Sequence, residues 1–216
     1  MNEITIMLPN YNGSKFVERA IESVKAQTYK NFICNIVDDG SSDNSVDKIL
    51  KSIKNDKRFN LTALGENLKL ANARNVAAKL AQTPYLAALD SDDEWLPEHL
   101  SLRLDYIKKT SADFLYGQMK VIGNRYVIDK NNPKQLIDIT DFSQGATIFI
   151  KRDVFNELGG YRNVYAEDGD IWERAYEMNF NVQRVEFETY IYYRNEGSIT
   201  DLMEKKMKLD GNNNTI

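Results

Sequence analysis

Acidic side chains gather in three short segments of the 216-residue chain, at residues 38–43, 90–93 and 167–170. Crowded carboxylates repel one another unless a cation lies nearby. In the second segment, Asp90 and Asp92 can present oxygen atoms to a hard divalent ion such as Mg²⁺ or Mn²⁺, which completes its coordination with water and diphosphate oxygens. We therefore predict a metal site that holds a nucleoside diphosphate and neutralises it as a leaving group.

The first acidic segment, residues 38–43, has two compatible interpretations. Ser42 or Asp43 can cap the helix that follows the turn. A carboxylate at the same strand end can also accept a hydrogen bond from the N–H group of a uracil ring, and Gly40 lets the backbone approach such a ligand closely.

The third acidic segment, residues 167–170, stands at the start of a predicted helix. Acidic residues are common there because the helix dipole favours them. A reaction in which a hydroxyl group attacks also needs a base to take its proton, and a carboxylate near the reacting centre is the usual solution. We predict Asp168 as this catalytic base.

The elements that must position these segments alternate along the first half of the chain. Apolar, β-rich runs occur at residues 4–8, 32–37, 61–64 and 85–89, and apolar residues repeat at helical spacing between them. This alternation indicates an α/β fold with a mostly parallel sheet. Polar segments at residues 10–12, 38–43 and 90–93 follow the first, second and fourth predicted strands. They should therefore converge at the carboxyl edge of the sheet, where open α/β sheets bind ligands.

The second half is less regular. It predicts strands near residues 114–118, 126–128, 146–150, 182–187 and 190–194, and a helix over residues 170–178. We expect a single domain over residues 1–200, made of a nucleotide-binding half (1–112) and an acceptor-binding half (113–200), with a polar C-terminal tail at 201–216.

Composition narrows the class of protein. The hydrophobic content of 42% is that of a globular chain, and the net charge of -4 argues against a nucleic-acid partner. Cys34 is the single cysteine, which excludes an internal disulfide and favours a reducing compartment. It lies in an apolar run and is interpreted as a buried strand residue. No apolar run approaches the ~18 residues of a membrane span. We expect a cytoplasmic protein, at most in peripheral contact with the inner face of the membrane.

Two further observations exclude other sites. The only histidine, His99, lies on a predicted helix and is interpreted as a surface residue, so no histidine-based triad can form. Residues 9–13, which follow the first predicted strand, match neither the dinucleotide-binding fingerprint nor the phosphate-loop motif. The chain is therefore not expected to be a dehydrogenase or a P-loop protein.

Four motifs, in this order, closely resemble those of glycosyltransferase family 2, and the resemblance spans most of the chain. They are Leu8-Pro9-Asn10-Tyr11-Asn12, Ser23-Val24-Lys25-Ala26-Gln27-Thr28-Tyr29, Val37-Asp38-Asp39-Gly40-Ser41-Ser42-Asp43 and Leu89-Asp90-Ser91-Asp92-Asp93-Glu94-Trp95-Leu96-Pro97. A fifth feature, Glu167-Asp168 before a Trp-containing helix, adds to it.

The resemblance implies the GT-A fold, which is a Rossmann-like nucleotide-diphospho-sugar transferase fold with a central, mostly parallel mixed sheet flanked by helices. It also implies a nucleotide-sugar donor, with a UDP-sugar favoured, a Mn²⁺ or Mg²⁺ cofactor and an inverting single displacement. The acceptor it implies is a saccharide or lipid-linked glycan in bacterial cell-surface polysaccharide synthesis.

The resemblance also assigns site residues by motif matching. Asp92 resembles the direct metal ligand of a DxD pair, Asp90 its partner nearer the ribose or metal, and Asp168 the catalytic base. The residues that resemble donor-binding positions are Pro9 and Tyr11 in the nucleoside pocket, Asp39 on the base, and Arg74.

Some positions depart from the family pattern. The family usually has glycine where this chain has Lys69 and Ala77, and relatives often carry a histidine at the position of Asn195. These departures leave open a sugar-nucleotide-binding relative without catalysis. A sugar nucleotidyltransferase has less support because residues 9–13 do not form a glycine-rich phosphate loop, and the absence of a Gln-x-x-Arg-Trp motif argues against a processive synthase.

Overall fold

The computed structural model describes residues 2–128, 132, 135–141, 147–164 and 166–194. The expected tail at 201–216 and Asn195 lie outside the described residues, as does residue 146 of the predicted strand 146–150. Within the described part, no helix combines the length and the apolar character that crossing a bilayer requires.

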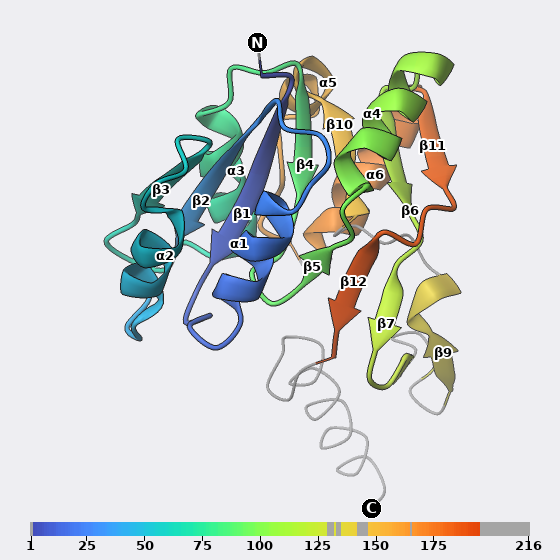
Figure 1. The fold of residues 1–216 in the computed structure, drawn as a ribbon. Coiled ribbons are helices and arrows are strands. Elements are labelled where there is room, and N and C mark those ends of the chain that lie inside the picture. The colour runs from blue at the N-terminus through green and yellow to red at the C-terminus, as the bar shows by residue number, and fades with distance from the viewer. Residues whose placement is uncertain (1, 129–131, 133–134, 142–146, 165, 195–216) are drawn as a thin grey trace, which may run out of the picture.

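Seven strands of the described residues form one mixed sheet (Figure 1). In spatial order they are β11 (Val182–Val185), β6 (Phe114–Gly117), β10 (Phe149–Lys151), β4 (Tyr85–Ala88), β1 (Ile4–Asn10), β2 (Phe32–Asp38) and β3 (Phe59–Ala63). β10 runs antiparallel to both of its neighbours, and the other pairs are parallel. All strands of this sheet except β10 therefore end at the same edge, towards the bottom of Figure 1.

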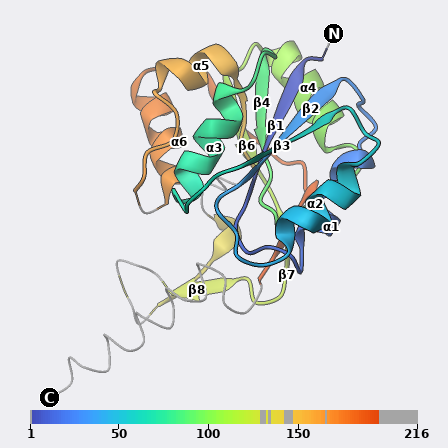
Figure 2. The same cartoon turned by 90° about the vertical axis from the view of Figure 1, so that its left-hand side faces the viewer.

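Helices cover both faces of the sheet (Figure 2). One face carries α1 (Val17–Lys25), α2 (Ser45–Ile53) and α4 (His99–Thr110), and the other carries α3 (Leu70–Lys79), α5 (Arg152–Glu157) and α6 (Glu167–Glu177). Each layer of helices packs its own buried cluster against the sheet. This is the doubly covered arrangement expected of a mostly parallel sheet.

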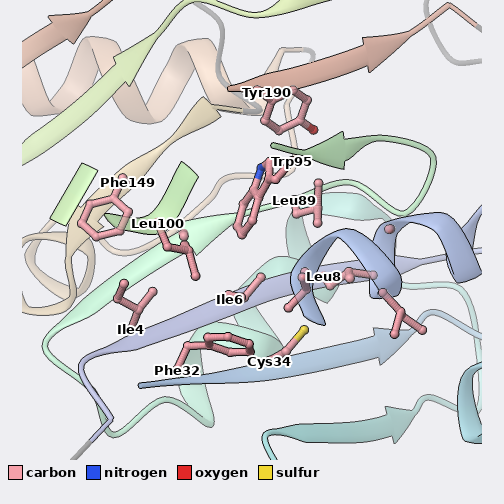
Figure 3. Close-up of a cluster of buried hydrophobic side chains, with 14 of the residues drawn as sticks. Ile4, Ile6, Leu8, Phe32, Cys34, Leu89, Trp95, Leu100, Phe149 and Tyr190 are labelled. Carbon is pink, nitrogen blue, oxygen red and sulfur yellow. The ribbon is translucent and has the colours of Figure 1, made fainter. Parts of the chain in front are cut away.

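β1 shows how the sequence produces two cores. Ile4, Ile6 and Leu8 belong to the cluster on the α1 side, whereas Met7 belongs to the cluster on the α3 side. Successive side chains of a strand point to opposite faces, so a strand buried on both faces must be apolar throughout. Figure 3 shows the first of these clusters, with Cys34 of β2 beside β1, and the predicted burial of Cys34 is confirmed.

A second, smaller sheet lies beyond the carboxyl edge. Its strands are β5 (Glu94–Trp95), β12 (Tyr190–Tyr193) and β7 (Lys120–Ile122), with β12 in the centre. A hairpin of β8 (Tyr126–Ile128) and β9 (Leu136–Asp138) follows, and then the 3-10 helix η1 (Ile139–Asp141). Because β5 directly follows the acidic segment 90–93, this sheet lies next to that segment, and β12 bonds to Asp93 within it.

The α/β fold with a mostly parallel sheet is confirmed, and the element boundaries shift by a few residues. β1 continues to Asn10, β3 begins at Phe59, and β11 ends at Val185. α6 begins at Glu167 rather than at residue 170, so the third acidic segment forms the first turn of the helix.

The prediction that His99 lies at the surface was wrong. Its side chain is fully buried, and its ring stacks on Trp95 with centroids 4.1 Å apart. Nδ1 lies 3.0 Å from Thr189 Oγ1. Burial, together with the charge of Arg103, lowers the pKa of His99 well below its usual value. The helix periodicity did not reveal this because the covering residues come from β5 and the β12 region.

Candidate active site

The loops after β1 and β2 are joined by a hydrogen-bond network at the carboxyl edge. Asn10 Nδ2 donates to Asp38 Oδ2 at 2.7 Å, and the backbone N–H of Ser41 donates to Asp38 Oδ1 at 3.0 Å. Asp43 accepts the backbone N–H of Ser45 at 2.9 Å, where α2 begins. The turn interpretation of this segment is thus correct, because Asp38 binds the backbone within the turn. The capping prediction was wrong, because the N-cap of α2 is Asn44, which makes no capping bond with its side chain, and neither Ser42 nor Asp43 occupies that position.

Gly13 brings the first loop against the acidic segment after β4. A Cβ atom at this position would lie 2.3 Å from Asn10 Oδ1 and 3.1 Å from Ser91 Oγ. The distance to Asn10 is shorter than Cβ atoms tolerate, and the distance to Ser91 is tight, so glycine suits a position where the loop after β1 lies against Ser91. The nucleotide-side and metal-side candidates are consequently neighbours in space.

The donor-binding candidates Pro9 and Tyr11 lie on either side of the end of β1. Pro9 is buried within the strand, where it pairs with Val37 of β2. Tyr11, two residues further, is 51% exposed. Tyr11 therefore presents a free aromatic surface at the carboxyl edge, whereas Pro9 shapes the strand that carries it.

Asp39 differs from Asp38 in its partners. Its buried carboxylate accepts the backbone N–H groups of Leu68 at 2.8 Å and Lys69 at 2.9 Å. These bonds tie the end of β2 to the loop that enters α3. A carboxylate offers about four lone-pair sites, so two contacts leave acceptor capacity for a ligand.

Lys69 adopts a backbone conformation that is normally reserved for glycine. Its φ of 77° and ψ of 159° lie in a region that residues with a Cβ atom rarely enter. Its N–H is held by Asp39 Oδ2 and by Asn67 Oδ1, the latter at 3.1 Å. The chain therefore keeps the backbone geometry of the glycine implied at this position, although the side chain is a lysine.

Arg74 of α3 joins the second and third acidic segments. Its guanidinium is almost completely buried and donates to Asp90 Oδ1 at 2.6 Å and to Glu167 Oε1 at 2.8 Å. Burial alone lowers the pKa of Arg74, but attraction to Asp90 and other nearby anions outweighs it and raises the pKa above its usual range. It also lies 5.2 Å from the centre of the Tyr161 ring. Arg74 is thus a permanent cation between the predicted metal ligand and the predicted base.

Asp168 lies beside this cluster in the first turn of α6. The residue as a whole is partly buried, and its Oδ1 accepts the backbone N–H of Gly169 at 2.8 Å. Burial raises the pKa of Asp168, the charge of Arg74 opposes that rise, and the charge of Asp90 adds to it. A carboxylate with a raised pKa is a stronger base, which suits proton removal from a hydroxyl group.

The acidic segment after β4 divides its carboxylates between two roles. Asp93 is buried and accepts the Tyr190 hydroxyl at 2.7 Å and the backbone N–H of Tyr193 at 2.9 Å. Asp90 and Asp92 remain partly exposed. Asp93 thus anchors the turn to β12, and Asp90 and Asp92 are the carboxylates that a ligand can reach.

The carboxylate oxygens of the acidic turn suit the expected divalent metal ion when a bound ligand supplies the rest of its coordination. Among the described residues, no group of three or more His, Cys, Asp or Glu side chains is arranged to hold an ion. Mg²⁺ and similar ions commonly bind through one or two carboxylates plus substrate phosphates and water. Two reachable carboxylates on one turn, Asp90 and Asp92, meet that description.

Sequence reasoning missed several partners in this site. Glu167 was expected only as part of an acidic helix start, but it shares Arg74 with Asp90. Tyr190 and Tyr193 were expected only as strand residues, and Arg19 of α1 was not considered. Its guanidinium donates to the backbone carbonyl of Asp92. Glu167 could have been found from the Glu167-Asp168 pair that resembles the family. No local sequence pattern indicates a site role for Tyr190, Tyr193 or Arg19.

A separate cleft of about 620 Å³ opens at the carboxyl ends of β6 and β11. It lies at the opposite end of the sheet from β2 and on the same edge. Its polar and charged lining residues include Gln118, Lys120, Arg125, Thr140, Glu186 and Glu188.

Residues 5–164 match the model of the family described as Glycosyl transferase family 2. The chain belongs to glycosyltransferase family 2. It is 30% identical over 174 residues to the UDP-Glc:alpha-D-GlcNAc-diphosphoundecaprenol beta-1,3-glucosyltransferase WfgD of Escherichia coli, covering 78% of this chain and 68% of WfgD. The enzyme class that follows from this membership is that of a glycosyltransferase.

Two solved structures share the fold of this chain. TarS 1-349 of S. aureus, in complex with UDP-GlcNAc, superposes with a TM-score of 0.77 at 22% identity, over 91% of this chain and 60% of that chain. The mannosyltransferase PcManGT from Pyrobaculum calidifontis, in complex with GDP-Man and Mn2+, gives a TM-score of 0.74 at 15% identity, over 91% of this chain and 58% of that chain. The expectation of a GT-A fold is confirmed, and the chain spans about three fifths of each of these solved chains.

Proposed function

We propose that this chain transfers a sugar from a nucleotide-diphosphate donor to an acceptor hydroxyl, with inversion at the anomeric carbon. The main support is that Arg74 binds Asp90 directly and also acts electrostatically on Asp168. A candidate base and a candidate metal ligand thus share one buried cation at the carboxyl edge. We assign donor binding to residues 1–112 and acceptor binding to residues 113–200.

A UDP-sugar is the donor that we favour. WfgD uses UDP-Glc according to its name, and TarS binds UDP-GlcNAc in its solved complex. In this chain, Asp39 retains acceptor capacity for the N–H group of uracil, and the exposed ring of Tyr11 can cover the base.

The reaction would be a single displacement. The acceptor oxygen forms a bond to the anomeric carbon while the bond from that carbon to the diphosphate oxygen breaks, and the electron pair of the broken bond leaves with the nucleoside diphosphate. Asp168 takes the proton of the attacking hydroxyl, because its raised pKa makes it the more effective base. Arg74 holds Glu167 and Asp90 in position around it.

Asp92 and Asp90 would hold the Mn²⁺ or Mg²⁺ ion, whose chemistry when bound is to neutralise charge on the departing diphosphate. The solved complex of PcManGT contains Mn2+. Asp93 contributes indirectly, since its bonds to Tyr190 and Tyr193 hold the turn against β12.

We propose that the acceptor binds at the end of the sheet where the cleft opens beside β6 and β11. The cleft is lined by hydrogen-bonding residues, such as Gln118 and Thr140, of the kind that bind sugar hydroxyl groups. The proposed acceptor is a saccharide or lipid-linked glycan of bacterial surface polysaccharide synthesis, reached from the cytoplasmic side with at most peripheral membrane contact. The name of WfgD, which includes a diphosphoundecaprenol-linked acceptor, supports this class.

Calorimetric titration of UDP with and without Mn²⁺ tests the donor site. We expect binding that strengthens with Mn²⁺, and we expect Asp92→Asn to remove that increase. Asp105→Asn is the matched control, because Asp105 is an exposed carboxylate on α4. If Asp92→Asn and Asp105→Asn bind equally well in the presence of Mn²⁺, the assignment of Asp92 is wrong.

A catalytically inactive sugar-nucleotide-binding relative is the second candidate, favoured by the departures at Lys69 and Ala77. Slow hydrolysis of UDP-sugars without acceptor separates the two. A competent site releases UDP over hours and loses this activity in Asp168→Asn, whereas a pure binding protein releases none.

A further inference from the structure

Three different elements hold the acidic turn at residues 90–93. Arg74 of α3 binds the side chain of Asp90, and β12 binds the side chain of Asp93. The third contact comes from α1, where Arg19 Nη2 donates to the backbone carbonyl of Asp92. The proposed metal ligand Asp92 is therefore held through its backbone by a residue from the opposite face of the sheet to Arg74.

Arg19 is itself held between aromatic rings. Its guanidinium carbon lies 3.5 Å from the centre of the Tyr193 ring and 5.7 Å from that of Phe16. A guanidinium that stacks on an aromatic ring is restricted in orientation, and its N–H groups, which lie in the guanidinium plane, stay available to other partners. Arg19 thus contacts the Tyr193 ring and the Asp92 carbonyl at the same time.

Tyr193 is fixed in turn by the same acidic region. Its backbone N–H donates to Asp93 Oδ1 at 2.9 Å, and its hydroxyl donates to Glu94 Oε1 at 2.8 Å. Tyr193 is thus bonded through its backbone and through its hydroxyl to the two residues that follow Asp92. Arg19, Tyr193 and the turn form a closed set of contacts, which we call the Arg19 clamp.

We propose that Arg19 is a positioning residue that orients Asp92 for the divalent cation of the donor site. A hydrogen bond to the Asp92 carbonyl restricts rotation of the peptide between Asp92 and Asp93, and so limits the directions in which the Asp92 carboxylate can point. The positive charge of Arg19 also reduces repulsion among the carboxylates of the turn. This inference rests on the proposed function, since it concerns the metal side of that site.

Two pairs of variants separate orientation from folding. Arg19→Leu removes the hydrogen bond, the charge and the stack, whereas Arg19→Lys keeps a charge without the planar group. Tyr193→Leu removes the supporting ring, whereas Tyr193→Phe keeps the ring and loses only the bond to Glu94. Arg58→Leu is the matched control. Arg58 stacks on Phe32 at 4.5 Å and pairs with Asp56 beside the start of β3, at the opposite edge of the sheet.

The measurements are the UDP affinity with and without Mn²⁺ and the thermal unfolding of each variant. We expect Arg19→Leu to lose roughly 10-fold of the Mn²⁺-dependent affinity, which is the effect typical of residues that orient a metal ligand. Its affinity without Mn²⁺ should match that of the wild type. Tyr193→Leu should lose part of the gain in UDP affinity that Mn²⁺ produces, and Tyr193→Phe should keep that gain. Arg58→Leu should unfold at a lower temperature with an unchanged response to Mn²⁺.

The outcomes distinguish this inference from the proposed function. A folded Arg19→Leu protein with the full Mn²⁺-dependent increment would overturn the role of Arg19 alone. A wild-type protein that binds UDP without any response to Mn²⁺ would overturn the metal assignment and, with it, the clamp. If Arg19→Leu does not fold, Tyr193→Leu against Tyr193→Phe decides, because equal increments in those two variants contradict the proposal.

Discussion

Arg74 and Glu167 form an ion pair with a distance of 2.8 Å, although 93 residues separate them in the sequence. The same guanidinium binds Asp90 at 2.6 Å, so one cation connects α3, the turn after β4 and the first turn of α6. A buried charge that loses its partner is strongly unfavourable, whereas an intact pair contributes little net stability.

Arg74→Met should destabilise the protein by about 3 kcal/mol, because it leaves Asp90 and Glu167 without their cation. Chemical denaturation at pH 7 measures the change in the free energy of unfolding. Lys108→Met is the control, since it breaks an exposed pair with Glu3 and should cost less than about 1 kcal/mol. Equal losses in the two variants would show that Arg74 has no structural role beyond that of a surface cation.

Asp168→Asn should lower the turnover number by roughly 10²- to 10⁴-fold while UDP binding is retained, because the variant cannot take a proton. The pH dependence of kcat/KM gives a second measure. Burial raises the pKa of Asp168, so activity should be present above this raised pKa and be lost as the pH falls through it. The acid limb should therefore lie above the ordinary value of 3.8. Near-normal turnover in Asp168→Asn would rule out its role as the base.

Lys69→Gly should stabilise the protein by about 1 kcal/mol, because Lys69 holds a φ of 77° and a ψ of 159° that cost a residue with a side chain of order 1–3 kcal/mol. Part of that gain is lost to the greater freedom of glycine in the unfolded chain. Lys51→Gly on α2 is the matched control, where the same change should destabilise by about 1 kcal/mol. Thermal unfolding of both variants checks the opposite signs.

His99→Phe should reduce the loss of stability in mild acid. The folded protein keeps His99 neutral because burial and Arg103 depress its pKa, whereas the unfolded chain takes up a proton near pH 6.5. Stability from this residue is therefore present above pH 6.5 and is lost as the pH falls below it. Between pH 7 and pH 5.5, wild-type protein should lose about 1 kcal/mol more than the variant.

The free energy of unfolding, measured against pH for the wild type and for His99→Phe, isolates the contribution of His99. Carboxyl groups with raised pKa values, such as Asp93 and Asp168, act in the opposite direction as the pH falls, since the folded state holds their protons more readily. Their contributions are present in both proteins and cancel in the difference. Parallel curves for wild type and His99→Phe would contradict a buried, neutral histidine.

The sequence predicted the main sheet and the location of the site from local patterns. Apolar runs on β1, β2 and β4 indicated strands buried on both faces, and polar residues directly after them indicated a shared edge. These inferences succeeded because strand burial and strand ends are encoded within a few neighbouring residues. The second half was located with less accuracy, since its short strands pair with distant segments and carry a weaker alternation.

By itself, then, the sequence determined the fold class, the family and the three acidic segments. Only the tertiary structure decided that Asp93 is an internal anchor, that His99 is buried, and that Arg74 is shared by two segments. It also decided that Lys69 occupies a glycine conformation and that Arg19 reaches Asp92. The reason is physical. Residue type and spacing set what a side chain can bind, but burial and partners depend on which elements of the folded chain pack together.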